Sequence, residues 1–247
     1  FNYEGYCINI LDTPGHEDFS EDTYRTLMAA DSAVMVIDAS KGVEKQTIKL
    51  FKVCVMRHIP IFTFINKMDR EANDPFELLD EIENVLGIAT CPINWPIGCG
   101  KAFKGVYDRK QKEVSLFKAA MNGQKEVDTK NISIDDDELK AEIGDDYWAK
   151  LEEDVELLDG ASAEFDLAKV QAGDLTPVFF GSALTNFGVE TFLQHFLDMT
   201  TSPLPRNSSV GLIDPFKEDF SAFVFKIQAN MNKAHSCLLY TSDAADD

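Results

Sequence analysis

The sequence of 247 residues predicts an α/β fold with a mainly parallel sheet. Three runs dominated by apolar residues, 33–37, 61–65 and 176–180, are short enough to be strands. Such runs are typical of parallel sheets, because helices cover both faces of their strands. Helical patterns separate the runs, and strand–helix–strand alternation favours the same fold. Ligands bind these sheets at the carboxyl ends of the strands, so the residues after each run are candidates for a site.

The other elements of the first part of the chain follow from turn residues and apolar spacing. A Gly in a short link predicts an antiparallel hairpin over residues 1–11. The composition of residues 17–30 favours a helix, and apolar spacings of three and four predict another over residues 43–58. Pro at the first turn and Gly after the last turn predict a helix over residues 75–86.

The alternation breaks in the second part of the chain. Five Gly and Pro residues indicate loops over residues 92–106. We take residues 99–173 as an inserted α+β subdomain, after which the α/β pattern resumes. The predicted segments after position 144 are helices over residues 145–158, 161–171 and 188–199, a linker over 203–219, the first strand of a β domain over 220–235, and a tail over 236–247 that looks foreign.

The composition argues against several classes of protein. The chain has 43 acidic and 23 basic residues and a net charge of −20, unlike a protein that coats nucleic acid or binds free DNA. It has no run of eighteen apolar residues, so we expect no membrane partner. Five Cys residues without a C-x-x-C pair suggest a cytoplasmic protein with reduced thiols. Residues 126–159, with 14 acids and three bases, form either a solvated acidic insertion or a specific binding surface.

The first motif, Asp12-Thr13-Pro14-Gly15-His16, follows the apolar run 6–11, which we expect to be a strand. An acid at a strand end can hold Mg²⁺ through a water, and the Gly N–H can reach a terminal phosphate without steric hindrance. The His can then point at the water that attacks this phosphate. The pattern D-x-x-G is common by itself, so the rest of the chain decides its meaning.

The second motif is Asn66-Lys67-Met68-Asp69, directly after the run 61–65. The Asp69 carboxylate can accept two hydrogen bonds from guanine, from N1–H and from the exocyclic amine. Adenine has neither donor, so this contact discriminates between the two bases. Asn66 can tie neighbouring loops to the base, and the stem of Lys67 can cover its face. By itself the motif is also compatible with a helix-capping turn.

The third motif, Ser182-Ala183, follows the run 176–180. Here the Ala183 backbone N–H can meet the carbonyl oxygen of guanine. The order D-x-x-G, N-K-x-D, S-A, each after a predicted strand, is the pattern of GTP-binding proteins.

The first motif, ending in His rather than Gln, resembles that of the translational GTPases related to elongation factor G. Four further stretches resemble the bacterial family of peptide-chain release factor three: residues 17–27, 95–101, 103–107 and 223–231. The resemblance extends to about residue 235. It implies a P-loop-NTPase-like GTPase domain over residues 1–202, followed by the start of a β-barrel domain. It also implies GTP or GDP with Mg²⁺ as cofactors, and the ribosome and the codon-reading release factors as partners.

The resemblance also implies roles for single residues. Asp12 would hold Mg²⁺ through water, Gly15 would contact the γ-phosphate, and His16 would position the hydrolytic water. The nucleotide-binding set would be Asp12, Thr13, Pro14, Gly15, His16, Asn66, Lys67, Met68, Asp69, Ser182 and Ala183. Residues 13–23 would form the second switch, ordered with GTP and released with GDP.

The sequence departs from the family pattern at the phosphate cradle, because it contains no G-x-x-x-x-G-K-S/T motif. In the family this motif precedes the position of Phe1, so we expect this chain by itself to bind GTP very weakly. Two alternatives to a release-factor GTPase stay open: an elongation factor G-type translocation GTPase, and a non-catalytic scaffold of GTPase ancestry.

Overall fold

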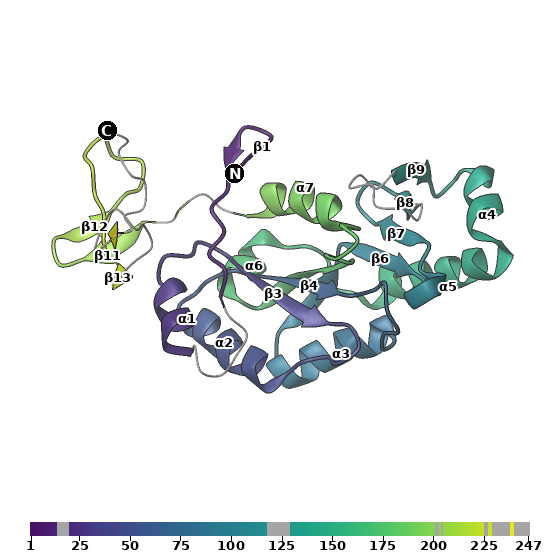
Figure 1. Cartoon of the computed structure of the whole chain (residues 1–247), viewed down its shortest axis with the longest axis horizontal. Helices are drawn as coiled ribbons and strands as arrows, with labels where there is room; N and C mark the ends of the chain where they lie inside the picture. The colour runs from purple at the N-terminus through teal and green to yellow at the C-terminus, as the bar shows by residue number, and fades with distance from the viewer. Residues whose placement is uncertain are drawn as a thin grey trace. The chain divides into compact units, whose positions relative to one another are not determined.

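Strands β3 (Ala33–Asp38), β4 (Ile61–Asn66), β10 (Leu175–Phe180) and β5 (Ala89–Pro92) form the central sheet, in that order (Figure 1). The structure is a computed structural model that describes residues 1–13, 20–117, 129–200, 203, 205–224, 227–228 and 238–239. The chain divides into two units, one of residues 34–200 and one of residues 1–33 with 201–247.

The central sheet confirms the predicted parallel arrangement. Strand β10 pairs in parallel with β4 on one side, with Val178 opposite Thr63, and with β5 on the other side. All six residues of β10 are buried, as a strand in the middle of a covered sheet requires. Both β4 and β10 end at the same edge of the sheet, which brings the residues that follow them close together.

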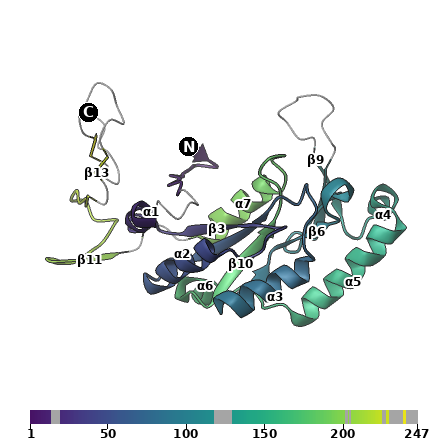
Figure 2. The same cartoon turned by 60° about the horizontal axis from the view of Figure 1, so that its bottom comes forward.

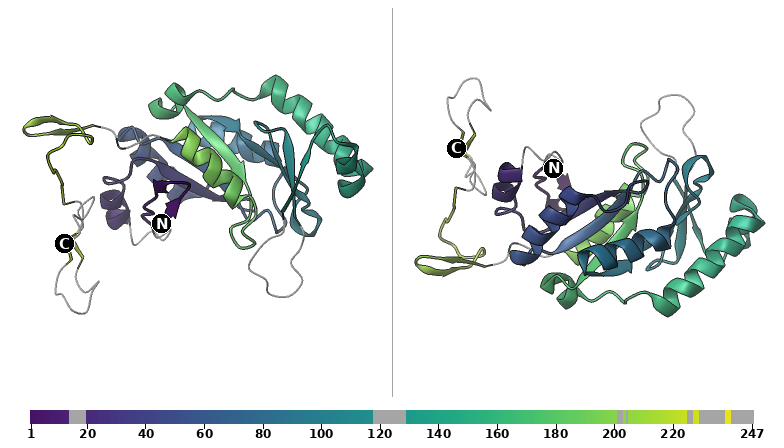
Figure 3. Two further views of the ribbon diagram at one scale, coloured as in Figure 1. Left: turned by 90° about the horizontal axis from the view of Figure 1, so that it is seen from above. Right: turned by 90° about the horizontal axis from the view of Figure 1, so that it is seen from below.

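Helices cover the two faces of this sheet. Helices α2 (Lys45–Met56) and α3 (Pro75–Leu86) lie on one face, and α7 (Val189–Met199) lies on the other (Figure 3). The side chain of Asp74 caps α3 by accepting hydrogen bonds from the backbone N–H groups of Phe76 and Glu77, and Gly87 ends the helix in the left-handed conformation.

Aromatic rings fill the space between α7 and the sheet. The ring of Phe196 lies edge-on to Phe62, with centroids 4.8 Å apart, and Phe192 contacts Phe64 and Phe179 in the same way. Helix α6 (Leu167–Ala172) adds Val170 to this cluster. Edge-to-face contacts between large rings are favourable beyond the apolar area that they bury, so they help to fix α7 against the sheet.

A second, antiparallel sheet follows β5. Its order is β6 (Asn94–Ile97), β7 (Gly105–Asp108), β8 (Glu113–Phe117) and β9 (Thr129–Ser133), and a short 3₁₀ turn, η2 (Gly100–Ala102), joins β6 to β7. Helix α4 (Asp137–Ile143) and the long helix α5 (Asp145–Ala161) follow it (Figure 2).

Two buried contacts join the antiparallel sheet to the parallel sheet and to its helix α7. The Asn94 side chain pairs with both backbone groups of Phe180, at 2.7 and 3.0 Å. His195 of α7 pairs with Asp108 at the end of β7, with Nε2 and Oδ2 2.5 Å apart.

The other unit contains short elements. Strands β1 (Asn2–Tyr3) and β2 (Tyr6–Cys7) form an antiparallel hairpin, and α1 (Ser20–Thr26) follows. Strands β11 (Arg206–Ser208) and β12 (Gly211–Ile213) form a second hairpin, and β13 (Ile227–Gln228) pairs with β14 (Leu238–Leu239). The Arg206 guanidinium donates to the carbonyl oxygen of Met28 at 3.0 Å.

Several local predictions differ from the structure. The strand expected over residues 6–11 ends at Cys7. Ile8 still exchanges two backbone hydrogen bonds with Phe1, each 2.9 Å long, but residues 9–11 have no ladder partner among the described residues. Ile10 is 73% exposed, and Asp12 therefore follows an irregular segment rather than a strand. We predicted that helices cover both faces of every strand in this sheet. This is wrong for β3, which lies at the sheet edge and has Val34 and Val36 exposed.

Three further segments also differ. The loop expected over residues 92–106 contains β6, because residues 94–97, Pro96 included, pair with β7. The helix expected over residues 161–171 starts only at Leu167, where Asp166 caps it. Of the strand expected over residues 220–235, residues 220–224 are irregular and Ile227–Gln228 is a strand, which pairs with Leu238–Leu239 of the tail. The proposed domain boundaries stay predictions.

Candidate functional site

Asn66 is the centre of the candidate site, at the carboxyl end of β4. Its side-chain oxygen, Oδ1, accepts hydrogen bonds from the backbone N–H of Lys67 at 2.8 Å and of Ala183 at 2.9 Å. Backbone bonds continue this connection, since Met68 N–H donates to the Gly181 carbonyl at 3.1 Å. Asn66 therefore ties the loop after β4 to the loop after β10, two segments that are far apart in sequence.

Asp69 is held by the loop after β10. The Ser182 hydroxyl donates to Asp69 Oδ1 at 2.6 Å, and the second oxygen of Asp69 lies 3.9 Å from Arg70 Nε. Ser182 is fully buried and is fixed by two backbone bonds to Phe187, each 2.9 Å long. With a side chain only 19% exposed, Asp69 presents an oriented carboxylate at the rim of the sheet.

Lys67 contacts an acid that we did not assign to the site from the sequence. Its ammonium group lies 2.5 Å from Oδ2 of Asp38, the last residue of β3. Burial raises the pKa of Asp38, but hydrogen bonds from Lys67 and Ser40 outweigh this effect and lower it to about 2. The position of Asp38 at a strand end beside β4 was the signal that could have identified it.

Gly181 allows the loop after β4 and the loop after β10 to lie close together. A Cβ atom at this position would lie 2.5 Å from the Phe187 carbonyl oxygen and 2.8 Å from the Phe64 ring. Backbone cannot move aside cheaply at such distances, so no larger residue fits without displacing the Ser182 loop. Gly181 also donates its N–H to the carbonyl of Ile65 at 3.0 Å.

The structure brings together Asn66, Lys67, Met68, Asp69, Ser182 and Ala183. The Ala183 N–H, which we expected to meet guanine, donates to Asn66 here. Asp12 is exposed and belongs to the other unit, as does Thr13, while Pro14, Gly15 and His16 lie outside the described residues.

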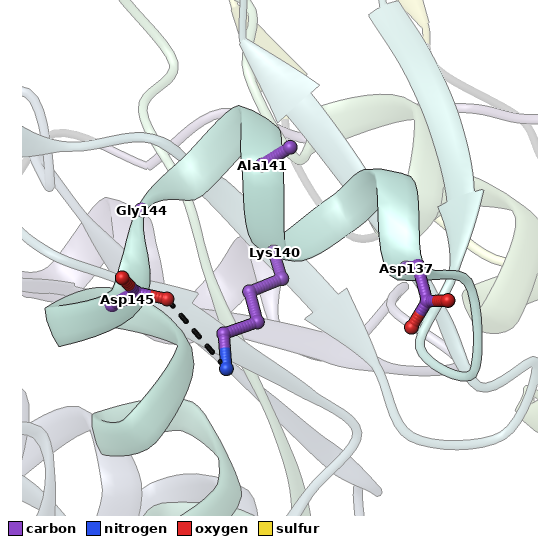
Figure 4. Close-up of a pocket in the computed structure, with 5 residues that line it drawn as sticks. All are labelled: Asp137, Lys140, Ala141, Gly144 and Asp145. Carbon is purple, nitrogen blue, oxygen red and sulfur yellow. Dashed lines mark ion pairs between the residues drawn. The ribbon is translucent and has the colours of Figure 1, made fainter.

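A hollow at the junction of α4 and α5 has a different character. Figure 4 shows its lining residues, Asp137, Lys140, Ala141, Gly144 and Asp145. The Lys140 ammonium pairs with Asp145 at 3.6 Å, and both side chains are more than half exposed. These side chains converge on no common point, so we do not assign a site there.

The described part of the chain offers neither a preformed metal cluster nor a membrane span. No group of three or more His, Cys, Asp and Glu side chains there is arranged to hold a metal ion. No helix among those residues combines the length and the apolar character needed to cross a membrane.

A parallel sheet with helices on both faces and paired polar groups at neighbouring strand ends defines a nucleotide-binding α/β domain. Residues 1–202 match the family described as the elongation factor Tu GTP binding domain. The chain belongs to this family of GTP-binding domains. This confirms the predicted GTPase fold class.

Two curated relatives are each called peptide chain release factor 3. The chain is 59% identical over 235 residues to the protein of Symbiobacterium thermophilum and 55% identical over 235 residues to that of Gloeothece citriformis. Each match covers 95% of this chain and 44% of the relative. The chain therefore spans less than half the length of these relatives.

A solved structure from Thermus thermophilus has a similar fold. It matches 93% of this chain and 34% of its own, with a TM-score of 0.65 and 22% sequence identity. At this identity the likeness supports the arrangement of elements and nothing finer.

Proposed function

We propose that the protein containing this chain is a ribosome-dependent, cytoplasmic GTPase of translation termination, which promotes the dissociation and recycling of codon-reading release factors. The observation that carries the GTP assignment is the Ser182–Asp69 hydrogen bond of 2.6 Å, which orients a carboxylate beside Asn66. The likeness to proteins called peptide chain release factor 3 supports the role in termination and the ribosome and release factors as partners.

Guanine is read by the loops after β4 and β10 in this proposal. Asp69 accepts hydrogen bonds from N1–H and the exocyclic amine, and Ser182 keeps its carboxylate in the required orientation. Asn66 and Ala183, already paired at 2.9 Å, border the base at its other edge. Lys67 covers one face, and Met68, fully buried, holds the loop against the sheet.

The phosphates and the hydrolytic water belong to the first motif. Asp12 is an exposed carboxylate, which suits a hard cation such as Mg²⁺ held through a water. A bound Mg²⁺ would supply neutralising charge at the phosphates. Gly15, after Pro14, offers its N–H to the γ-phosphate, and His16 orients the attacking water.

The base assignment is tested by Asp69→Asn in the full-length protein. We expect the wild type to bind GDP more tightly than inosine diphosphate, which lacks the exocyclic amine. In the variant an amide replaces one acceptor, so affinity for GDP should fall at least about tenfold and the preference should largely disappear. Asp80→Asn, at an exposed position of α3, is the matched control. An unchanged preference in the Asp69 variant would remove the base site.

The catalytic assignment is tested by His16→Ala in the same protein. Ribosome-stimulated GTP hydrolysis should fall by at least about a hundredfold, because a positioned group contributes this much to such steps, while GDP affinity stays the same. Survival of hydrolysis would show that another group positions the water. GTP-dependent ejection of a bound release factor from ribosomes, rather than movement of tRNA, separates the proposed role from translocation.

A further inference from the structure

We infer that Asp38 is a positioning residue of the nucleotide site, which acts through Lys67 by holding its ammonium group so that the side-chain stem is preplaced along the face of the base. The inference rests on the proposed guanine site and adds a residue from a third strand to it. Asp38 should therefore affect the affinity for every purine nucleotide, whereas Asp69 determines which base is preferred.

The contact between the two residues joins neighbouring strand ends. Asp38 is the last residue of β3, and Lys67 directly follows β4, the next strand in the sheet. Lys67 Nζ lies 2.5 Å from Asp38 Oδ2, and the backbone N–H of Ala39 donates to the Asn66 carbonyl at 3.0 Å. The acid therefore sits on a rigid element whose position relative to the Asn66 loop is fixed.

The second oxygen of Asp38 is also held. Ser40 donates to Oδ1 from its hydroxyl at 2.7 Å and from its backbone N–H at 3.0 Å. The carboxylate is only 11% exposed, and its lowered pKa keeps it charged throughout the physiological range. Asp38 is thus an oriented anion with one oxygen left for Lys67, which is the arrangement expected of an anchor.

Lys67 is fixed at two points, at its ammonium group by Asp38 and at its backbone N–H by Asn66, so its conformation is set before a nucleotide binds. Its backbone has φ of +73°, a conformation that is uncommon for a residue with a side chain, and the Asn66 side chain holds its N–H there. A free lysine loses much rotamer freedom when its stem is placed against a ligand. With the ammonium group bound to Asp38, this loss is incurred on folding and not on nucleotide binding.

The stem of Lys67 is apolar, so it contacts the face of a base and not the hydrogen-bonding groups at its edge. Removing the anchor should therefore weaken the binding of every purine nucleotide by the same factor. The preference for guanine, which depends on the edge, should stay unchanged. A variant that alters affinity without altering selectivity is a readout that a disturbed Asp69 would not give.

The test is a double-mutant cycle in the full-length protein with Asp38→Asn, Lys67→Met and the double variant, measured with GDP and with inosine diphosphate. Lys67→Met keeps an apolar stem but cannot reach the carboxylate. Each single variant should lose about three- to tenfold in affinity for both nucleotides, the effect of freeing one side chain. The double variant should lose no more than either single one, because the same contact is removed once.

Lys41→Ala is the control, since Lys41 lies in the loop after Asp38 and pairs at 3.4 Å with exposed Glu44. It should bind both nucleotides like the wild type. Additive losses in the cycle, wild-type affinity of either single variant, or a changed ratio between the nucleotides would overturn the inference. If Asp38→Asn fails to fold, Lys67→Met still tests the same contact. If the wild type itself showed no preference for GDP over ADP, the proposed guanine site would be refuted.

Discussion

Asp38 illustrates at the scale of a residue how a nearly buried charge is kept. Burial disfavours its charged form, and an isolated carboxylate in this position would have a raised pKa. Hydrogen bonds from Lys67 and Ser40 more than offset this effect and lower the pKa to about 2. The lysine is 42% exposed, so water screens part of its attraction and the net stabilisation is modest.

This pKa leads to a prediction for stability. Since the folded-state pKa lies below the ordinary value of 3.8, the charged Asp38 stabilises the fold above about pH 5, and this contribution is lost as the pH falls toward 2. Asp38→Asn should therefore reduce the free energy of unfolding by about 1–2 kcal/mol at pH 7, after allowance for screening. Urea unfolding of both proteins between pH 7 and pH 3 should show the difference shrinking below about pH 4. A difference independent of pH would mean that shape, not charge, accounts for the loss.

At the scale of elements, β6 connects the antiparallel sheet to the parallel sheet. Asn94, its first residue, is fully buried and supplies both a donor and an acceptor to the backbone of Phe180. The next residue, Trp95, donates its indole N–H to buried Asp154 of α5 at 3.0 Å. The Asn94 side chain thus satisfies both backbone groups of Phe180 at the end of β10, close to the Gly181 loop that carries Ser182.

Replacing Asn94 should therefore be costly. Asn94→Ala leaves the N–H and the carbonyl of Phe180 buried without partners, and we expect it to lower the free energy of unfolding by about 2–4 kcal/mol. Asn131→Ala is the matched control, because this asparagine bonds to Ser115 on an exposed part of the same sheet. It should cost less than about 0.5 kcal/mol. If urea unfolding showed the same loss of unfolding free energy for both variants, the Asn94 contacts would not stabilise the connection between the sheets.

At the scale of the whole molecule, the charge is unbalanced. The net charge is −20, and residues 126–159 contribute −11 of it, with 14 acids and three bases. Each of these three bases already pairs with an acid: Lys130 with Glu138 and Glu142, Lys140 with Asp145, and Lys150 with Asp154. Most acids of this segment therefore repel one another across water, and this repulsion opposes the compact state.

Salt should accordingly stabilise the chain. Raising NaCl from about 20 to 200 mM shortens the screening length from roughly 20 Å to below 10 Å, so repulsion between the acids weakens. We expect the midpoint of thermal unfolding to rise by about 2–5 °C, the shift that corresponds to roughly 1 kcal/mol in a protein of this size. KCl at the same ionic strength should act equally. A constant or falling midpoint would show that attractive ion pairs outweigh the repulsion.

The local pattern was sufficient for much of the fold. The strand at residues 61–65 and the helix at 75–86 have nearly the predicted bounds, because an apolar run before a polar end and a capped amphipathic stretch are local signals. The strand after Gly5 was overestimated because a strand also needs a ladder partner. Ile8 still pairs with Phe1, but residues 9–11 have no such partner among the described residues.

The sequence by itself determined the class of fold, the two loops of the candidate base site and the residue types that they carry. Only the tertiary structure decided which side chains meet. Lys67 and Asp38 are 29 residues apart, Asn94 and Phe180 are 86 apart, and Ser182 and Asp69 are 113 apart. Contacts over such separations leave no local periodicity to detect. They depend on the order of strands in the sheet, which places the ends of β3, β4 and β10 along one edge.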